Sequence, residues 1–345
     1  MVKKIAAGLG ILPAIVKVKA GKPIPLFCQW ETTFRCNMNC VFCSIPQNSA
    51  KWSETTTAEA LDIIDQLGEM GTKIMNFSGG EPFLRKDFFE MADRAKKNGM
   101  IVFVNTNGLL VEENIGGITR ERFDFMRISI DGSKELHDRL RKCNGAFDAA
   151  FKAVELIKKK GIGCMINTVV TKDTKPGELS ELLERAKGIG VKVSLTPAVP
   201  FQPCEENEGK AELDEEFENA LIDVPGFMAL LNEMKRQYPG TVDDLKSYWK
   251  ILEKGGLEKF GCRVMDIAIG IKPDGRVSFP CTVFPAKMVK GRLKEVFYGE
   301  EAERQRRLQG RYSFCQNCFS RCGSFPTLIL DFGSLFSMAR NWGGF

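Results

Sequence analysis

Alternating strands and helices dominate residues 24–200 and limit the possible folds more than any other feature. Short apolar runs that end in small or polar residues alternate with segments whose apolar residues recur at helical spacing. This alternation predicts parallel strands joined by helical crossovers. The predicted strands cover 25–33, 73–77, 101–105, 126–130, 162–170 and 191–195, and the predicted helices cover 57–70, 87–97, 147–160 and 179–187. Six strands are fewer than the eight of a closed barrel, so we expect an α/β fold with an open, partial barrel.

Polar motifs follow the carboxyl ends of four predicted strands. They are a cysteine triplet, Ser78-Gly79-Gly80-Glu81, Asn105-Thr106-Asn107-Gly108 and Ser129-Ile130-Asp131-Gly132. Ligands of parallel α/β sheets bind outside these strand ends. The sequence therefore predicts a binding site at this rim, although Asn107-Gly108 taken alone is also typical of a plain turn.

The triplet Cys36, Cys40 and Cys43 belongs to a set of twelve cysteines. Thiols this close cannot easily pair in unstrained disulfides, and the chain shows no cleavable secretion signal, so they indicate metal ligands in a reducing, cytoplasmic setting. Three thiolates on a [4Fe–4S] cluster leave one iron open to a small molecule. The alternative is a zinc or ferredoxin-type site that a distant cysteine completes.

The motif Cys36-x3-Cys40-x2-Cys43, with Phe42 before its last cysteine and Gly79-Gly80-Glu81-Pro82 further on, resembles the radical S-adenosylmethionine (radical SAM) superfamily. The resemblance covers about residues 24–200. It implies a partial (β/α)6 TIM-like barrel and a [4Fe–4S] cluster whose open iron binds SAM. Its expected chemistry is reductive cleavage of SAM to methionine and a 5′-deoxyadenosyl radical, which abstracts hydrogen from an unactivated C–H bond.

The resemblance also implies roles for residues around SAM. Gly79, Gly80 and Glu81 would meet its amino group, and Phe42 would approach the adenine through its backbone. Further residues expected along the cleft are Ser129 and Asp131, near the ribose or methionine end, and Asn105, Arg141 and Asn167. No catalytic residue is assigned, but Cys204 follows the sixth strand near the rim and is a candidate. The single histidine, His137, is expected to be a helix-start or surface residue.

A second cysteine group resembles the SPASM and twitch auxiliary-cluster domains of the same superfamily. It comprises Cys262, Cys281, Cys315, Cys318 and Cys322, and a predicted β-hairpin at 267–279 lies between the first two. Five cysteines are too few for two clusters, so the resemblance implies one auxiliary [4Fe–4S] cluster. Which four cysteines bind it stays open, and a zinc knuckle is the alternative. The isolated Cys28, Cys143 and Cys164 are expected to be buried apolar thiols.

The predicted organisation is a basic apolar segment at 1–23, the barrel at 24–200, an acidic helical linker at 201–257, the auxiliary-cluster domain at 258–324 and an apolar tail at 325–345. The apolar stretch near the N-terminus is too short to span a bilayer. Both terminal segments either pack on the core or lie on an anionic membrane surface. We therefore expect a cytoplasmic protein, which would be peripheral at the inner membrane face if the terminal segments lie on the membrane. The net charge of +5 does not predict nucleic-acid binding.

The apolar termini favour a lipid or isoprenoid-type substrate, modified by C–C or C–S bond formation. The alternatives are ribosomal-peptide maturation and tetrapyrrole side-chain modification by the same radical chemistry. An alternative of another class is a non-catalytic electron carrier with two clusters, against which Gly79-Gly80-Glu81 argues because a carrier needs no SAM. The expected partner is a reducing electron donor such as a ferredoxin or flavodoxin.

Overall fold

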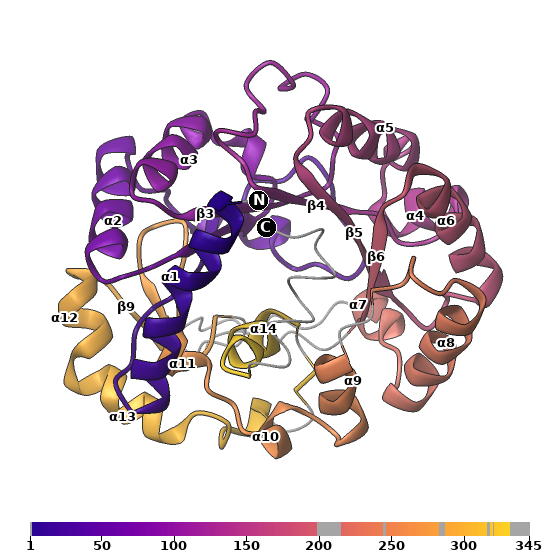
Figure 1. The fold of residues 1–345 in the computed structure, drawn as a ribbon. Helices are drawn as coiled ribbons and strands as arrows, with labels where there is room; N and C mark the ends of the chain where they lie inside the picture. The colour runs from indigo at the N-terminus through magenta and orange to yellow at the C-terminus, as the bar shows by residue number, and fades with distance from the viewer. Residues whose placement is uncertain are drawn as a thin grey trace.

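The fold of the chain comes from a computed structural model (Figure 1). It describes residues 2–198, 215–243, 246–282, 287–315, 318–319 and 321–331. The expected substrate-facing Cys204 and most of the acidic stretch before residue 223 lie outside these residues.

A nine-stranded sheet in the order β6-β5-β4-β3-β2-β1-β7-β8-β9 forms the centre of the molecule. Its first six strands are parallel, as predicted, and β1 and β6 do not pair, so the barrel is open and partial. The bounds of these strands are β1 (Phe27–Thr33), β2 (Ile74–Gly79), β3 (Ile101–Thr106), β4 (Phe125–Ser129), β5 (Gly163–Val170) and β6 (Lys192–Pro197).

Helices cover the outer side of this sheet (Figure 1). Four match the predictions: α2 (Thr57–Glu69), α3 (Phe88–Lys97), α5 (Ala146–Lys159) and α6 (Pro176–Ile189). The pattern missed α4 (Lys134–Arg141), whose eight residues are mostly charged and show no long apolar period. Its start is nevertheless well defined, because the Ser133 side chain accepts a hydrogen bond from the Leu136 N–H.

The two faces of the sheet differ in polarity. On the outer face, Trp30, Phe77 and Val104 are fully buried, and the Phe77 ring lies 5.4 Å from that of Phe88 on α3. Successive strand residues point to opposite sides, so their neighbours form the inner face of the barrel. This inner face is largely polar; it includes Gln29, Asn76, Ser78, Asn105, Arg127, Ser129, Asn167 and Ser194.

The predicted hairpin is confirmed as β7 (Ala268–Ile271) and β8 (Val277–Phe279), followed by β9 (Lys287–Val289). β7 pairs in parallel with β1, and β8 and β9 add to it antiparallel. The segment that carries the second cysteine group therefore continues the barrel sheet.

The remaining helices lie beyond β6 and around the hairpin. They are α7 (Glu215–Ala220), α8 (Val224–Gln237), α9 (Lys246–Glu253), α10 (Leu257–Phe260), α11 (Val264–Ile267), α12 (Leu293–Tyr298), α13 (Glu300–Leu308) and α14 (Arg321–Ile329). Single 3-10 turns cover Pro46–Lys51, Pro82–Leu84 and Ser313–Cys315.

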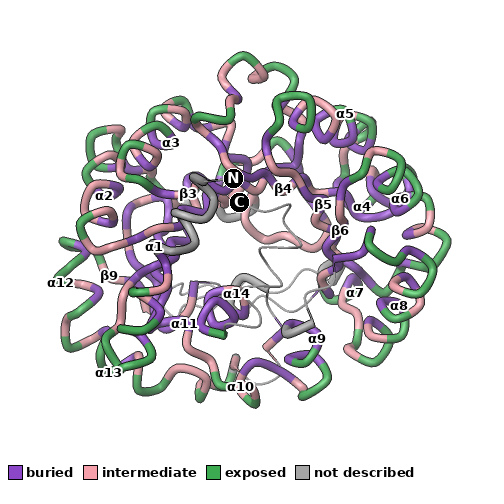
Figure 2. The backbone as a smooth tube through the Cα atoms, viewed as in Figure 1, coloured by how far each residue is buried: buried purple, intermediate pink, exposed green. Residues whose placement is uncertain are grey.

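Where the terminal segments are described, they pack on the core (Figure 2). In α1 (Val2–Lys19), Ile11, Ile15 and Val18 are buried. The start of the apolar tail is buried from Leu328 to Leu330, and residues 332–345 lie outside the described part. None of the helices within the described ranges is both long and apolar enough to cross a bilayer.

Candidate active site

Cys36, Cys40 and Cys43 lie together in the loop after β1. They form a small apolar cluster with Met38, Phe42, Leu109 and Ala146. Burial and, to a smaller extent, the neighbouring thiols raise the pKa of Cys36, and together they raise the pKa of Cys43 to about 12. A metal cluster would take up these thiols as thiolates and release their protons.

The number of thiols in the triplet matches three ligands of a cluster, each from the same loop. A cubane cluster binds each cysteine at a different iron, so its thiols must lie further apart than the ligands of one zinc ion. Three thiols in one loop therefore suit three corners of a [4Fe–4S] cluster.

Gly79 and Gly80 hold the base of the cysteine loop against the end of β2. The Gly80 N–H donates to the Thr33 carbonyl at 2.7 Å, and the Glu81 N–H donates to the Arg35 carbonyl at 2.9 Å. A Cβ atom at Gly79 would lie 2.3 Å from the Thr33 oxygen, and one at Gly80 would lie 2.1 Å from the Arg35 oxygen. Glycine is thus required here by the contact between two loops of the chain itself.

The Glu81 carboxylate is completely buried and joins the turns after β2 and β3. It accepts hydrogen bonds from the Thr106 hydroxyl at 2.8 Å, the Asn107 N–H at 2.9 Å and the Phe83 N–H. Burial raises the pKa of Glu81 to about 7, although these hydrogen bonds act in the opposite direction. Its expected contact with the SAM amino group stays a prediction.

Asp131 and Arg141 form a buried ion pair beside the cysteines. The Arg141 Nε donates to an Asp131 oxygen at 2.6 Å, and the other Asp131 oxygen accepts from the Val169 N–H at 2.9 Å. Nη1 of Arg141 lies 3.7 Å from the Cys40 sulfur, and the guanidinium stacks over the Phe42 ring at 5.1 Å. Of the predicted site residues, Arg141 therefore reaches the cysteine loop, and Asp131 holds its guanidinium there.

His137 lies in the first turn of α4, as a helix-start residue was expected to, but it is not a surface residue. It is fully buried in α4, and its Nδ1 accepts a hydrogen bond from the Asp131 N–H at 3.0 Å. Burial lowers the pKa of His137 to about 4, so the ring is neutral at pH 7. The sequence pattern does not indicate this burial, because the residues of α4 are mostly charged and show no long apolar period.

The remaining predicted cleft residues line the inner face of the barrel. Ser129 and Asn167 are register partners on β4 and β5, and Asn105 pairs with Arg127 across β3 and β4. Sequence reasoning missed Asn107, whose Nδ2 lies 3.9 Å from the Cys36 sulfur and 2.7 Å from the Asn37 side-chain oxygen. Its only signal was the Asn-Gly pair, which is typical of turns.

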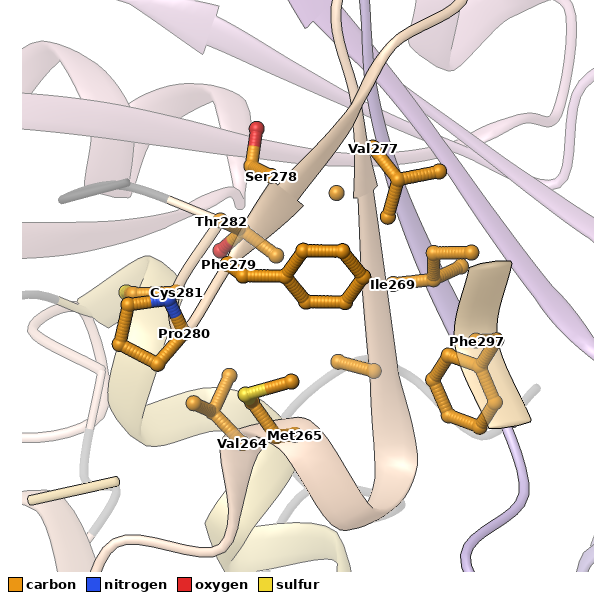
Figure 3. Close-up of a pocket in the computed structure, with 12 residues that line it drawn as sticks. Val264, Met265, Ile269, Val277, Ser278, Phe279, Pro280, Cys281, Thr282 and Phe297 are labelled. Atoms are coloured by element: carbon orange, nitrogen blue, oxygen red, sulfur yellow. The ribbon is translucent and has the colours of Figure 1, made fainter. Parts of the chain in front are cut away.

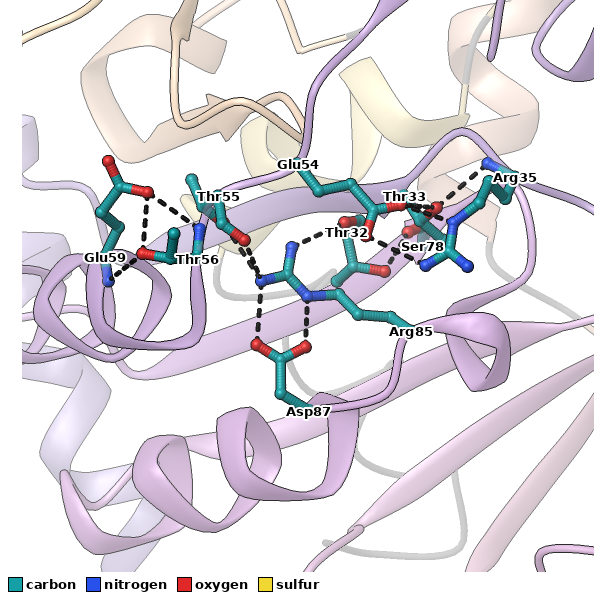
Figure 4. A network of polar contacts seen from close by, with 10 residues as sticks. All are labelled: Thr32, Thr33, Arg35, Glu54, Thr55, Thr56, Glu59, Ser78, Arg85 and Asp87. Carbon is teal, nitrogen blue, oxygen red and sulfur yellow. Dashed lines mark hydrogen bonds and ion pairs between the residues drawn. The ribbon is translucent and has the colours of Figure 1, made fainter. Parts of the chain in front are cut away.

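Two arginines stabilise the end of β1, which leads into the cysteine loop, through ion pairs and hydrogen bonds (Figure 4). Arg85 is 3% exposed; it pairs with Asp87 at 2.7 Å and donates to the carbonyls of Thr32 and Thr55. Arg35 pairs with Glu54 through two hydrogen bonds of 2.8 and 3.0 Å. Burial alone would raise the pKa of Glu54, but hydrogen bonds from Arg35 and Thr33 lower it below its usual value.

Four cysteines of the second group line one pocket, which is partly open to solvent. They are Cys262, Cys281, Cys315 and Cys318, with mainly apolar neighbours that include Leu257, Val264 and Pro280. Figure 3 shows Cys281 and Pro280 at the edge of the adjoining pocket, beside Phe279 and Met265. Burial strongly raises the pKa of Cys262, and the other three thiols add to this. Four thiols around one cavity fit a four-cornered cluster.

The isolated cysteines are placed less uniformly than predicted. Cys28 is buried, and Cys164 is partly buried against the main core. Cys143 is wrongly predicted as a buried apolar thiol, because it is only half-buried and packs in the cluster of the first triplet. Cys322 lies on α14, but the described part of the structure does not include its side chain.

The two cysteine sites are linked through the β7–β8 turn. The Thr55 N–H donates to the Pro273 carbonyl at 2.8 Å, and the Arg276 guanidinium lies 4.7 Å from the Trp52 ring centroid. Lys272 pairs with Glu31 of β1 at 2.5 Å, with both side chains largely buried. The hairpin that ends at Cys281 therefore contacts the strand and segment that support the first triplet.

Comparison with protein families gives a match to the Radical SAM superfamily over residues 30–186. An AdoMet-dependent heme synthase of Methanosarcina barkeri is 36% identical over 169 residues, which cover 48% of this chain and 48% of the relative. The Fe-coproporphyrin III synthase of the same organism is 33% identical over 45% of this chain and 38% of the relative. The mycofactocin maturase MftC of Mycolicibacterium smegmatis is 31% identical over 55% and 49%. The chain thus spans about half the length of these relatives or less.

Solved structures share the fold over most of the chain. Streptococcus suis SuiB bound to S-adenosylmethionine has a TM-score of 0.65 at 16% identity and covers 92% of this chain and 77% of its own. The enzyme anSMEcpe with bound AdoMet has a TM-score of 0.66 at 18% identity and covers 92% and 93%. These matches extend beyond the barrel into the segment with the second cysteine group.

Proposed function

We propose that this chain, which belongs to the radical SAM superfamily, abstracts hydrogen from a polar substrate, with a tetrapyrrole side chain as the first candidate. Enzymes of this superfamily use a [4Fe–4S] cluster and SAM. The observation that carries the proposal is the single rim on which three clustered thiols, Glu81 and the Asp131–Arg141 pair lie together. The identity of the substrate is part of this proposal.

When bound, the reduced cluster supplies the electron that breaks the S–C5′ bond of SAM and yields the 5′-deoxyadenosyl radical. Cys36, Cys40 and Cys43 would hold three of its irons. Gly79, Gly80 and Glu81 fix the loop above β2 so that it faces the triplet. The buried side chains around the site exclude water, which protects a reactive radical from side reactions.

The polar inner face of the barrel supports a polar substrate. Asn105, Ser129 and Asn167 lie on this face, and so does Arg127, whose guanidinium carbon is 5.3 Å from the Phe103 ring centroid. An arginine on this face suits a ligand that carries carboxylates, as the propionate side chains of a tetrapyrrole do. The expected lipid or isoprenoid substrate finds no support in the comparisons, whereas two of the relatives above are named for the synthesis of haem or Fe-coproporphyrin III.

Peptide maturation is the second candidate. It is favoured by the 31% identity to mycofactocin maturase MftC over slightly more than half of this chain. A peptide backbone would also suit the hydroxyl and amide side chains of the inner face.

We further infer that Cys262, Cys281, Cys315 and Cys318 hold the auxiliary cluster. The support is the one pocket that all four thiols line. Reduction of either cluster requires an external electron donor, for which a ferredoxin or flavodoxin stays the proposed partner.

An anaerobic assay tests the proposal in two stages. The chain is first reconstituted with iron and sulfide and incubated with SAM and dithionite, and 5′-deoxyadenosine is measured. The same assay then includes Fe-coproporphyrin III or coproporphyrin III in one arm and a peptide encoded beside the gene in another, with mass spectrometry of each product. A Cys40→Ala variant is the matched control for cluster-independent cleavage.

Each outcome decides between the candidates. Substrate-dependent 5′-deoxyadenosine with a mass change in the tetrapyrrole supports the first candidate, and a mass change in the peptide supports the second. Cleavage of SAM without either product would overturn both substrate assignments. No 5′-deoxyadenosine in any arm would leave only the two-cluster electron carrier.

A further inference from the structure

We propose that Arg141 and Asn107 raise the reduction potential of the cluster at the first cysteine site by donating hydrogen bonds to the sulfurs of Cys40 and Cys36. This inference rests on the proposed function, because it requires a [4Fe–4S] cluster held by the triplet. It assigns both residues a contact with cluster ligands, whereas a place along the SAM cleft was expected for Arg141 alone.

Arg141 is held firmly toward Cys40. Its Nη1 lies 3.7 Å from the Cys40 sulfur, and its Nε is bound to Asp131 at 2.6 Å. The Phe42 ring covers one face of the guanidinium, and the arginine side chain is 9% exposed. Asp131 is itself fixed by the Val169 N–H, so the guanidinium has little freedom to turn away from the sulfur.

Asn107 reaches the second sulfur from the turn after β3. Its backbone N–H is bound to the buried Glu81 carboxylate at 2.9 Å, which fixes the residue. Its Nδ2 lies 3.9 Å from the Cys36 sulfur and donates to the Asn37 side chain at 2.7 Å, while its Oδ1 accepts from the Leu109 N–H. The amide is therefore oriented with its N–H groups toward the cysteine loop.

These donors have a defined electrostatic consequence. Reduction adds negative charge to the cluster and its sulfurs, and an N–H group directed at a ligand sulfur stabilises the reduced form more than the oxidised form. The effect is strong at a buried site, where water does not screen the dipole. Because Asp131 partly compensates the charge of Arg141, removal of the Asp131 charge should act in the opposite direction to removal of the arginine.

The test is an anaerobic redox titration of the reconstituted full-length chain, monitored by electron paramagnetic resonance without SAM. The first-site signal is identified in a parallel sample as the one that SAM changes. The variants are Arg141→Met, Asn107→Ala and Asp131→Asn. In the last of these, the asparagine oxygen can still accept from the Arg141 Nε and keep the guanidinium in place, at the loss of the hydrogen bond from the Val169 N–H. Arg139→Met is the matched control, because Arg139 lies on the same helix and is exposed.

For Arg141→Met we expect a lower potential, with about a tenfold change in the reduction equilibrium, or about 59 mV for one electron. Asn107→Ala should shift it in the same direction by a smaller amount, Asp131→Asn should raise it, and Arg139→Met should leave it unchanged. A purely structural role would not give shifts of opposite sign. If Arg141→Met does not retain iron, the other two variants decide the question.

The inference is overturned if Arg141→Met and Asn107→Ala have the potential of Arg139→Met, or if Asp131→Asn shifts in the same direction as Arg141→Met. A wild-type chain without any SAM-responsive cluster signal would instead overturn the proposed function. The two failures are therefore distinguishable.

Discussion

The two cysteine sites of this chain differ in the polar groups that contact their thiols. The first triplet lies beside charged and amide groups, with Arg141, Asn107 and the buried Glu81 close by. The second group lines a cavity with mainly apolar walls, in which four thiols face one another. Polar neighbours suit a cluster that binds a polar cofactor and exchanges an electron with it, whereas an apolar enclosure suits a cluster whose irons are all held by the protein.

Of all the substitutions considered, one at the first cysteine site should have the largest effect. Cys40→Ala should abolish formation of 5′-deoxyadenosine, because the cluster loses one of only three ligands, and iron content should fall by about half if two clusters are bound. The matched control is Cys164→Ala, at a partly buried thiol of the main core. SAM cleavage that survives in Cys40→Ala would show that the triplet is not the cofactor site.

Removal of a thiol from the second site should have a different result. Cys281→Ala should lower the iron content but retain the SAM-induced change in the spectrum of the first cluster. Each of Cys262→Ala, Cys315→Ala and Cys318→Ala should behave similarly, because all four thiols line one cavity. Cys322→Ala tests the fifth cysteine of the group: an unchanged iron content would support the four-cysteine assignment, and a loss of iron would place Cys322 among the ligands.

Gly80→Ala tests whether the first site depends on the close contact between two loops. The new Cβ would lie 2.1 Å from the Arg35 carbonyl oxygen, so the backbone must shift, at a cost of about 3 kcal/mol in the free energy of unfolding. Gly188→Ala in α6 is the control, since no atom lies near its Cβ, and it should stabilise by about 0.5–1 kcal/mol. Denaturant unfolding measures both, and equal stabilities would contradict the loop contact.

His137 makes the polar site sensitive to acid. Its pKa is lowered from 6.5 to about 4 in the folded chain, so below pH 6.5 the unfolded chain binds a proton that the folded chain does not. Stability should therefore be constant above about pH 6.5 and fall by at most about 3 kcal/mol as the pH drops to 4. His137→Gln keeps an acceptor for the Asp131 N–H but does not titrate. The free energy of unfolding of this variant should therefore lack this part of the pH dependence. An unchanged slope would argue against a buried, neutral histidine.

The smallest effect is expected at Cys143. This thiol packs near Cys40, so the structure itself raises the question of a fourth protein ligand at the first site. If SAM occupies the fourth iron, Cys143→Ser should change neither iron content nor the response of the cluster spectrum to SAM. Loss of iron or of the response to SAM would show that four cysteines bind the cluster of the first site. No iron of that cluster would then be open to SAM.

The barrel and much of the first site could be predicted from the sequence, because both depend on local patterns. Strand and helix periods in residues 24–200 gave the alternation, and the spacing of Cys36, Cys40 and Cys43 placed three thiols in one loop. The roles of His137 and Asn107 could not be predicted. Each depends on a contact with a residue that is near in space only after the sheet has formed, such as the Asn107 contact with Cys36.

Sequence alone determined the chemistry that the chain can support, since the types and spacing of the cysteines and the Gly79-Gly80-Glu81 motif are properties of short segments. Tertiary structure decided which of those groups meet. Parallel strands bring their carboxyl ends to one rim, so Arg141 reaches Cys40 and Glu81 joins two turns, although these residues are far apart in the chain. The pairing of β1 with β7 likewise joins the second cysteine group to the barrel sheet. The sequence does not reveal this pairing, because backbone hydrogen bonds between distant strands leave no pattern in the residues of either strand.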